Sequence, residues 1–267
     1  MSELIEAIFP LPSGRLPGSM FDMDAFNKLN LLAADGLDDR LFYVPPLWRP
    51  VHAHEHQGPS LGSKLIAGTP GAARRAFELS RRVNPEHLAV CLNRVHPGIG
   101  GLPTRSDINA WRGFAIELPT RFECDYARPP MEPRLPDKLL VIHVRFVAAG
   151  VEPVYIIDAI TGRYFAFLKA DRTIPLNLGS GTQFDYDTAA RKLAKAVGGK
   201  PVPLNGYLPM PGACALLLND GHAPASAENA IVSCSAEKGL PVPTYGSTCD
   251  DFLAVAERIA ATPIIRF

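Results

Sequence analysis

The stretch 138–170 restricts the fold of this chain more than any other part of the sequence. It holds three runs rich in β-branched and aromatic residues, at 139–146, 154–159 and 163–170, with turn residues between them. Such runs are typical of neighbouring β-strands. The sequence therefore predicts a three-stranded antiparallel meander over about 138–170.

The first two runs also predict how their strands pair. Each run has one wholly apolar face, and a slip of one residue would put these faces on opposite sides of the sheet. Matching the two faces sets His143 directly opposite Asp158. An imidazole beside a carboxylate is an oriented base, but it is also an ordinary cross-strand pair that supports a sheet. Both interpretations of this pair stay open at this point.

The segments around the meander predict helices. Residues 85–95, 188–197, 225–233 and 249–261 have helical patterns, and the last follows the capping residues Ser247 and Thr248. We therefore expect an α+β fold, with a mostly antiparallel sheet centred on the meander and helices packed on one of its faces.

Proline is the unusual part of the composition. The chain of 267 residues has 26 prolines spread throughout, which predicts many extended, proline-rich connections around the sheet. This length fits one domain. We expect residues 1–267 to form a single α+β domain with an irregular region, rich in proline and glycine, over about 1–68.

The charge balance bears on the partners of the chain. Lys plus Arg and Asp plus Glu both number 27, so the formal net charge is zero. Nucleic acids and anionic membranes attract basic surfaces, so we expect neither as a partner. No apolar run approaches the roughly 20 residues of a membrane span. The five cysteines are odd in number and form no CxxC motif, which favours a reducing, cytoplasmic compartment.

Cys214 is the candidate nucleophile. If a helix begins at Pro211, the Cys214 thiol lies in its first turn, where unpaired N–H groups and the macrodipole lower its pKa. Cys214, His143 and Asp158 would then be the nucleophile, the base and the orienting carboxylate of a papain-like thiol site. This arrangement predicts a thiol hydrolase of the amidase, peptidase or deamidase type.

The chain order of these three residues resembles the circularly permuted branch of the NlpC-like hydrolases. The pair of His143 and Asp158 on neighbouring strands is also similar to transglutaminase-like and protein-glutaminase domains. In those domains the cysteine comes first, and Cys91 would be the nucleophile. The resemblance covers three residues and one hairpin, and it implies a thiol hydrolase of unspecified substrate.

A histidine cluster suggests a second kind of site. Residues 51–56 read VHAHEH, so His52, His54 and His56 would share one face of an extended segment. Three imidazoles can hold a catalytic zinc with an open fourth position. The spacing resembles the HxH elements of amidohydrolases, cupins and metallo-β-lactamases, which would imply a metal-dependent hydrolase. An exposed loop that is rich in histidine is the alternative.

Two further interpretations of the sequence concern an acidic motif and a non-enzymatic role. A Gly-Ser step before Asp185 and Asp187 is similar to an acidic motif of nucleotidyltransferases, in which the acids lie on a strand. We reject this comparison, because Asp187 is expected to cap the helix 188–197. A neutral, proline-rich chain also fits a non-enzymatic assembly subunit or protein-interaction module, with a protein partner or a second copy of itself.

Overall fold

The computed structural model describes residues 41–43, 65–66, 88–96, 99, 103–121, 137–158, 163–176, 182–209, 214–217, 225–228, 230–232 and 241–263. The three histidines of the expected metal site, and most of the irregular region expected over 1–68, lie outside these residues. Within the described part of the chain, no helix is long and apolar enough to cross a membrane.

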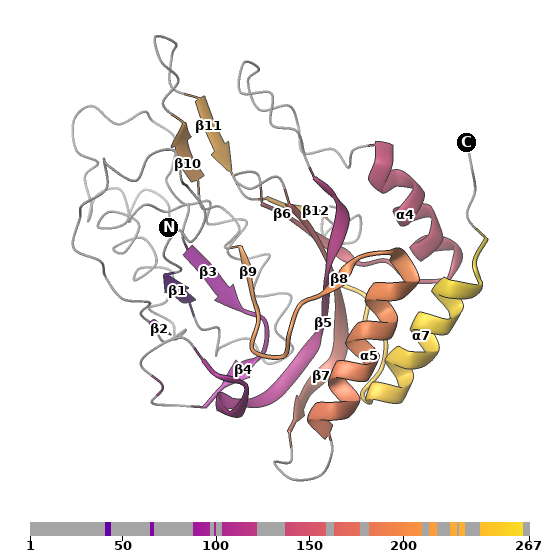
Figure 1. The fold of residues 1–267 in the computed structure, drawn as a ribbon, viewed down its shortest axis with the longest axis horizontal. Helices are drawn as coiled ribbons and strands as arrows, with labels where there is room; N and C mark the ends of the chain where they lie inside the picture. Colours follow the sequence, from indigo (N-terminus) through magenta and orange to yellow (C-terminus); the bar gives the residue numbers. More distant parts are fainter. Residues whose placement is uncertain are drawn as a thin grey trace.

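A six-stranded sheet lies at the centre of the molecule (Figure 1). Its long strands are β5 (Ile108–Arg121) and β7 (Arg163–Pro175), with β6 (Val154–Asp158) on the other side of β7. The strand order is β12-β6-β7-β5-β4, and β8 also pairs with β5. The short strands are β4 (Arg94–Val95), β8 (Lys200–Pro201) and β12 (Ala230–Val232). All of these pairings are antiparallel.

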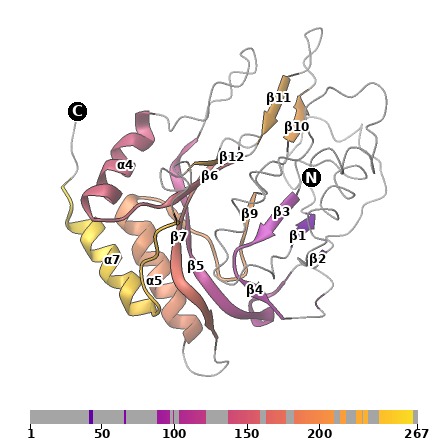
Figure 2. The same cartoon turned by 180° about the vertical axis from the view of Figure 1, so that it is seen from behind.

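Two smaller sheets hold the other strands of the described residues. One has the order β2-β1-β3-β9 and the other is the pair β10-β11. Their bounds are β1 (Leu41–Tyr43), β2 (Leu65–Ile66), β3 (Leu88–Cys91), β9 (Tyr207–Pro209), β10 (Cys214–Leu217) and β11 (Ala225–Glu228). Figures 1 and 2 show them on the side of the central sheet that faces away from the helices.

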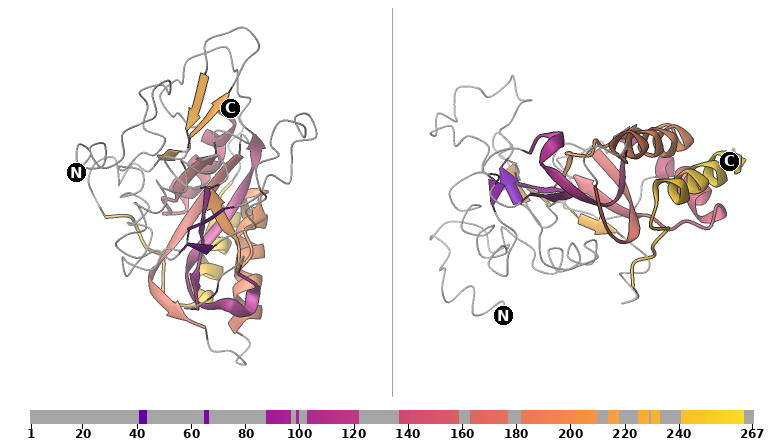
Figure 3. Two further views of the ribbon diagram at one scale, coloured as in Figure 1. Left: turned by 90° about the vertical axis from the view of Figure 1, so that its left-hand side faces the viewer. Right: turned by 90° about the horizontal axis from the view of Figure 1, so that it is seen from below.

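Three helices cover the opposite face of the central sheet, as the view from below in Figure 3 shows. They are α4 (Asp137–Ala148), α5 (Thr182–Val197) and α7 (Cys249–Ala261), and a short 3-10 turn, η2 (Arg105–Asp107), precedes β5. Phe114 of β5 stacks on Tyr186 of α5 at 4.5 Å between ring centroids and lies 4.7 Å from Phe252 of α7. The main core therefore lies between the sheet and this helical layer, and the expected α+β class with helices on one face is confirmed.

The first strand of the expected meander is wrong, because residues 137–148 form helix α4. Leu139, Ile142 and Phe146 are buried together in the core, and this spacing follows a helical rather than a strand period. The helix ends at Ala148. Gly150 follows with a left-handed φ of 71°, and the Val151 amide donates to the Phe146 carbonyl at 2.8 Å. Burial of this apolar stripe outweighs the β-propensity of the valines between these positions.

Of the other predicted strands and helices, some are confirmed and some are wrong. The strands at 154–159 and 163–170 and the helix 249–261 are present, and Thr248 caps that helix by accepting from the Asp251 amide. The helix expected at 188–197 begins earlier, at Thr182. The helices expected at 85–95 and 225–233 are wrong, since both segments form short strands.

Candidate functional site on the central sheet

The two faces of the central sheet differ in what they carry. On β5, Phe114 and Ile116 belong to the core under the helices, so the alternate residues Ala115 and Glu117 lie on the other face. The register pairs Glu117 with Phe165 of β7, and directly paired residues share a face. The face away from the helices therefore contains a charged residue of β5.

Strand β7 crosses the middle of this second face. Its residues Arg163, Phe165, Phe167 and Lys169 alternate with core residues, so they form one row along the strand. The two phenylalanines are buried, and the two cationic residues at the ends of the row are intermediate in exposure. A basic residue thus lies at each end of a buried aromatic pair.

Arg163 and Glu117 form the polar centre of the candidate site. Arg163 Nε lies 4.0 Å from Glu117 Oε1, and the two side chains are 31% and 27% exposed. On the other side of β7, Asp158 is the backbone register partner of Arg163. Arg163 thus lies on the strand between two acidic positions.

Lys169 is held in a less polar environment at the other end of the row. Partial burial disfavours its charged form and lowers the pKa of its ammonium group. Its backbone carbonyl accepts from the Tyr245 amide at 3.1 Å, which ties β7 to the segment before α7. A partly desolvated lysine attracts an anion more strongly than a fully hydrated one does.

Lys200 adds a further cation beside Glu117. It is exposed on β8, and the register pairs it with Glu117. Gly199 holds this segment against β5, because a Cβ there would lie 2.6 Å from the Glu117 carbonyl oxygen. The sequence Gly198-Gly199-Lys200 therefore ends α5 and brings a lysine to the edge of the candidate site.

The chemistry of this face suits an anionic ligand. Arginine binds phosphate or carboxylate oxygens through two parallel N–H groups, and lysine binds phosphate as a point charge. Among the described residues, no three His, Cys, Asp or Glu side chains gather where they could hold a metal ion. Glu117, the described carboxylate of this face, lies beside a guanidinium, which competes with a cation for its oxygens.

The structure places the residues of the predicted thiol site on other elements than expected. His143 lies on α4 instead of a strand, so its expected pairing with Asp158 is wrong; its Nδ1 is 3.0 Å from the hydroxyl of Tyr155. Partial burial lowers the pKa of His143, and the charge of Glu152 opposes this shift. Cys214 is the first residue of β10 and the register partner of Glu228, so it is not in a helical first turn.

The described cysteine side chains are poor candidates for a thiolate. Cys91, the alternative nucleophile, is buried in β3 and its Sγ donates to the Gly206 carbonyl at 3.8 Å. Burial raises the pKa of Cys249 to about 11, which leaves little thiolate at neutral pH. His52, His54 and His56 lie outside the described residues.

Sequence reasoning missed Glu117, Arg163 and Lys169, although two signals in the sequence indicate them. Glu117 is the one charged residue in the apolar run 114–118. Arg163 and Lys169 share a period of two with the phenylalanines of the same predicted strand. By contrast, Asp185 and Asp187 do lie in a helix and not on a strand, but the expected cap at Asp187 is wrong, since α5 begins at Thr182.

No family model and no curated protein matches the chain. Among solved structures, the chain is similar in fold to the AEP domain of the primase-polymerase (PrimPol) of cyanophage S-2L. The TM-score is 0.51 and the sequence identity is 11%, and the match covers 89% of this chain and 99% of that domain.

This likeness corrects two expectations and leaves the alternatives without support. The prediction of a thiol hydrolase is contradicted, because the solved structure that the chain resembles in fold is a primase-polymerase domain and not a thiol hydrolase. The alternatives, a metal-dependent hydrolase and a protein-interaction module, gain no support from it. The exclusion of nucleic acid is contradicted as well, because the domain that the chain resembles in fold is a primase-polymerase. That expectation rested on the net charge of the whole chain, which does not describe the charge of any one surface.

Proposed function

We propose that this chain is a nucleic-acid-binding domain with a primase-polymerase fold, and that the sheet face around Arg163 takes a phosphate of the bound strand or nucleotide. The observation that carries the proposal is the fold likeness, which spans 99% of the AEP domain of the cyanophage enzyme. Because a fold can host several functions, the charged residues of the site supply the second part of the argument.

Arg163 and Lys169 support the proposal by their placement. Both lie in the same row of β7, on the face away from the helices, at either end of Phe165 and Phe167. A phosphate that reached Arg163 would replace the long contact to Glu117, which at 4.0 Å is at the limit of an ion pair. Exchange of a weak internal pair for a bidentate phosphate contact is favourable for a guanidinium.

The proposal is limited to binding, because of which metal-ligating residues the described site offers. Polymerases join nucleotides with two metal ions held by carboxylates. In the part of the chain that the structure describes, the acidic positions 117 and 158 lie on either side of Arg163, and no metal-holding group is formed. These residues do not fit a two-metal centre, so the proposed role of the described site is binding. An expected cytoplasmic location, drawn from the cysteine pattern, suits such a role.

Anisotropy of a labelled single-stranded oligonucleotide tests the proposal. The wild-type chain should bind the strand with an affinity that falls as salt rises, and a nucleoside triphosphate should compete. Arg163→Gln should weaken binding about tenfold or more, because a charge-assisted contact is lost.

Arg172→Gln is the matched control, since Arg172 is an exposed arginine of the same strand and its replacement removes the same charge. It should leave binding within about twofold of wild type if the effect belongs to the site. A wild-type chain that binds neither DNA nor RNA strands at low salt would contradict the proposed function.

A further inference from the structure

The outer face of α5 carries an exposed aromatic residue and a line of cations. At 100° per residue, Phe184, Thr188, Arg191 and Lys195 fall within an arc of about 60°, and Lys192 borders it. Phe184 is 68% exposed, and Arg191, Lys192 and Lys195 are exposed too. The opposite face of the helix is buried in the core, through Tyr186 and Leu193 among others. We call the exposed residues Phe184, Arg191, Lys192 and Lys195 the α5 track.

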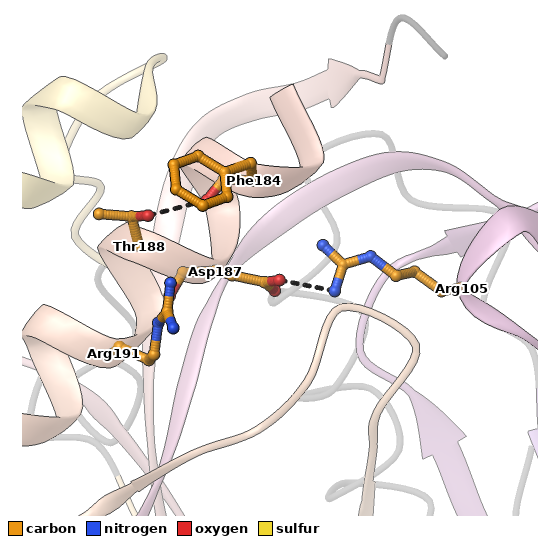
Figure 4. A network of polar contacts seen from close by, with 5 residues as sticks. All are labelled: Arg105, Phe184, Asp187, Thr188 and Arg191. Atoms are coloured by element: carbon orange, nitrogen blue, oxygen red, sulfur yellow. Dashed lines mark hydrogen bonds and ion pairs between the residues drawn. The ribbon is translucent and has the colours of Figure 1, made fainter. Parts of the chain in front are cut away.

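Two acids, Asp185 and Asp187, border this track, and Asp187 is already neutralised. Arg105 of η2 lies 2.6 Å from Asp187 through Nη1 and Oδ2, and Figure 4 shows the Asp187 side chain directed at Arg105, beside the helix. The Thr188 hydroxyl donates to the Phe184 carbonyl at 3.0 Å, so it is turned back to the helix backbone. Asp185 is exposed and lies about 20° from Lys192 around the helix, two turns away along its axis. With three basic residues against Asp185, the track keeps a net positive charge.

The chain runs from the end of the track to the edge of the central sheet. From Phe184 to Lys195 the track runs about 16 Å, over which a stacked nucleic-acid strand carries about five phosphates at 3.4 Å each. After the helix, Gly198 and Gly199 bring the chain to Lys200, which is exposed and paired with Glu117. Lys200 thus follows the last cation of the track, Lys195, by five positions along the chain.

We propose that the α5 track binds the backbone and one base of a single-stranded nucleic acid, outside the sheet site. The basic residues would contact phosphates, and the Phe184 ring would stack on an unpaired base, as aromatic residues do in single-strand-binding proteins. A single strand fits better than a duplex, because duplex bases are already stacked on each other and offer the ring no open face. This inference rests on the proposed function and adds a second contact surface to it.

Charge and aromatic variants separate the two contributions. Lys192→Gln with Lys195→Gln should weaken binding of a labelled single strand and reduce the slope of log K against log salt by about 1.4, since each lost phosphate contact contributes about 0.7. Phe184→Ala should weaken single-strand binding about fivefold or more and leave duplex binding unchanged.

Leu140→Glu with Ala254→Glu is the matched control. It lowers the net charge by the same two units at exposed positions of α4 and α7. It should keep the wild-type salt slope, because neither position lies on the track.

Several outcomes would overturn the track. The first is a slope of log K against log salt in the double lysine variant that equals the wild-type slope. The second is a decrease of this slope in the Leu140→Glu, Ala254→Glu control as large as in the lysine variant. The third is binding of poly-glutamate as tight as binding of the single strand. If the lysine variant binds like wild type while Arg163→Gln does not, the track fails and the proposed function stands. If the wild-type chain binds no nucleic acid, both fail together.

Discussion

Arg145 and Arg258 each bind the end of the helix that carries the other. Arg145, in the last turn of α4, donates from Nη2 to the Ile259 carbonyl of α7 at 3.1 Å. Arg258, in the last turn of α7, donates from Nε to the Ala149 carbonyl just after α4 at 3.3 Å. Final carbonyls have no partner within their own helix and carry partial negative charge, so this exchange fastens α4 to α7.

Replacing Arg145 should cost more than replacing Arg258. Arg145→Met keeps most of the apolar stem but removes a partly buried, charge-assisted hydrogen bond, so we expect a loss of about 1.5–3 kcal/mol in the free energy of unfolding. Arg258 is exposed, and Arg258→Met should cost less than about 1 kcal/mol. Urea unfolding of both variants measures the difference, and a larger loss for Arg258 would contradict the reciprocal cap.

His143 should make the stability of the fold depend on pH. Partial burial lowers its pKa in the folded state below the ordinary 6.5. Between these two pKa values the unfolded chain binds a proton and the folded chain does not, so acid favours unfolding. The contribution of neutral His143 is therefore complete above pH 6.5 and is lost as the pH falls through the lower, folded pKa.

The measurement is the free energy of unfolding in urea at a series of pH values from neutral to mildly acidic. His143→Gln should be less sensitive to acid than wild type over this window. Tyr155→Phe is the control, because it removes the hydroxyl 3.0 Å from His143 Nδ1 and keeps the titrating imidazole. Parallel curves for wild type and His143→Gln would mean that another group causes any acid loss.

The class of the fold could be predicted from the sequence, but its central strand order could not. The runs at 154–159 and 163–170 carry apolar residues on both faces, which is typical of a covered sheet, and both are strands. The run at 139–146 is equally rich in β-branched residues, yet Leu139, Ile142 and Phe146 pack as a helical stripe. A short apolar run does not distinguish a buried strand from a buried helix by composition. That the whole chain is one domain stays a prediction.

The candidate site was harder to predict, because it depends on register between distant strands. The sequence pairs His143 with Asp158 only if 139–146 is a strand. This segment is helix α4, and the register partner of Asp158 in the structure is Arg163 of β7. Glu117 comes to Arg163 from β5, 46 positions away along the chain (163 − 117). A net charge of zero likewise concealed the basic face of α5, since acids elsewhere balance it.

Gly199 should be more sensitive to substitution than its neighbour Gly198, because it fits the end of α5 against β5. A Cβ at 199 would lie 2.6 Å from both the Glu117 carbonyl oxygen and Ile116 Cγ2. Since a backbone atom of a central strand cannot give way cheaply, Gly199→Ala should lower the free energy of unfolding by about 1–3 kcal/mol. Gly198 has a left-handed φ of 73° with open space around it, so Gly198→Asn should be nearly neutral. Urea unfolding compares the two variants.

Gly199 also places Lys200 beside Glu117. Only Gly199→Ala should therefore weaken binding of a single strand. Equal stability and equal binding of the two variants would contradict the close approach of Gly199 to β5.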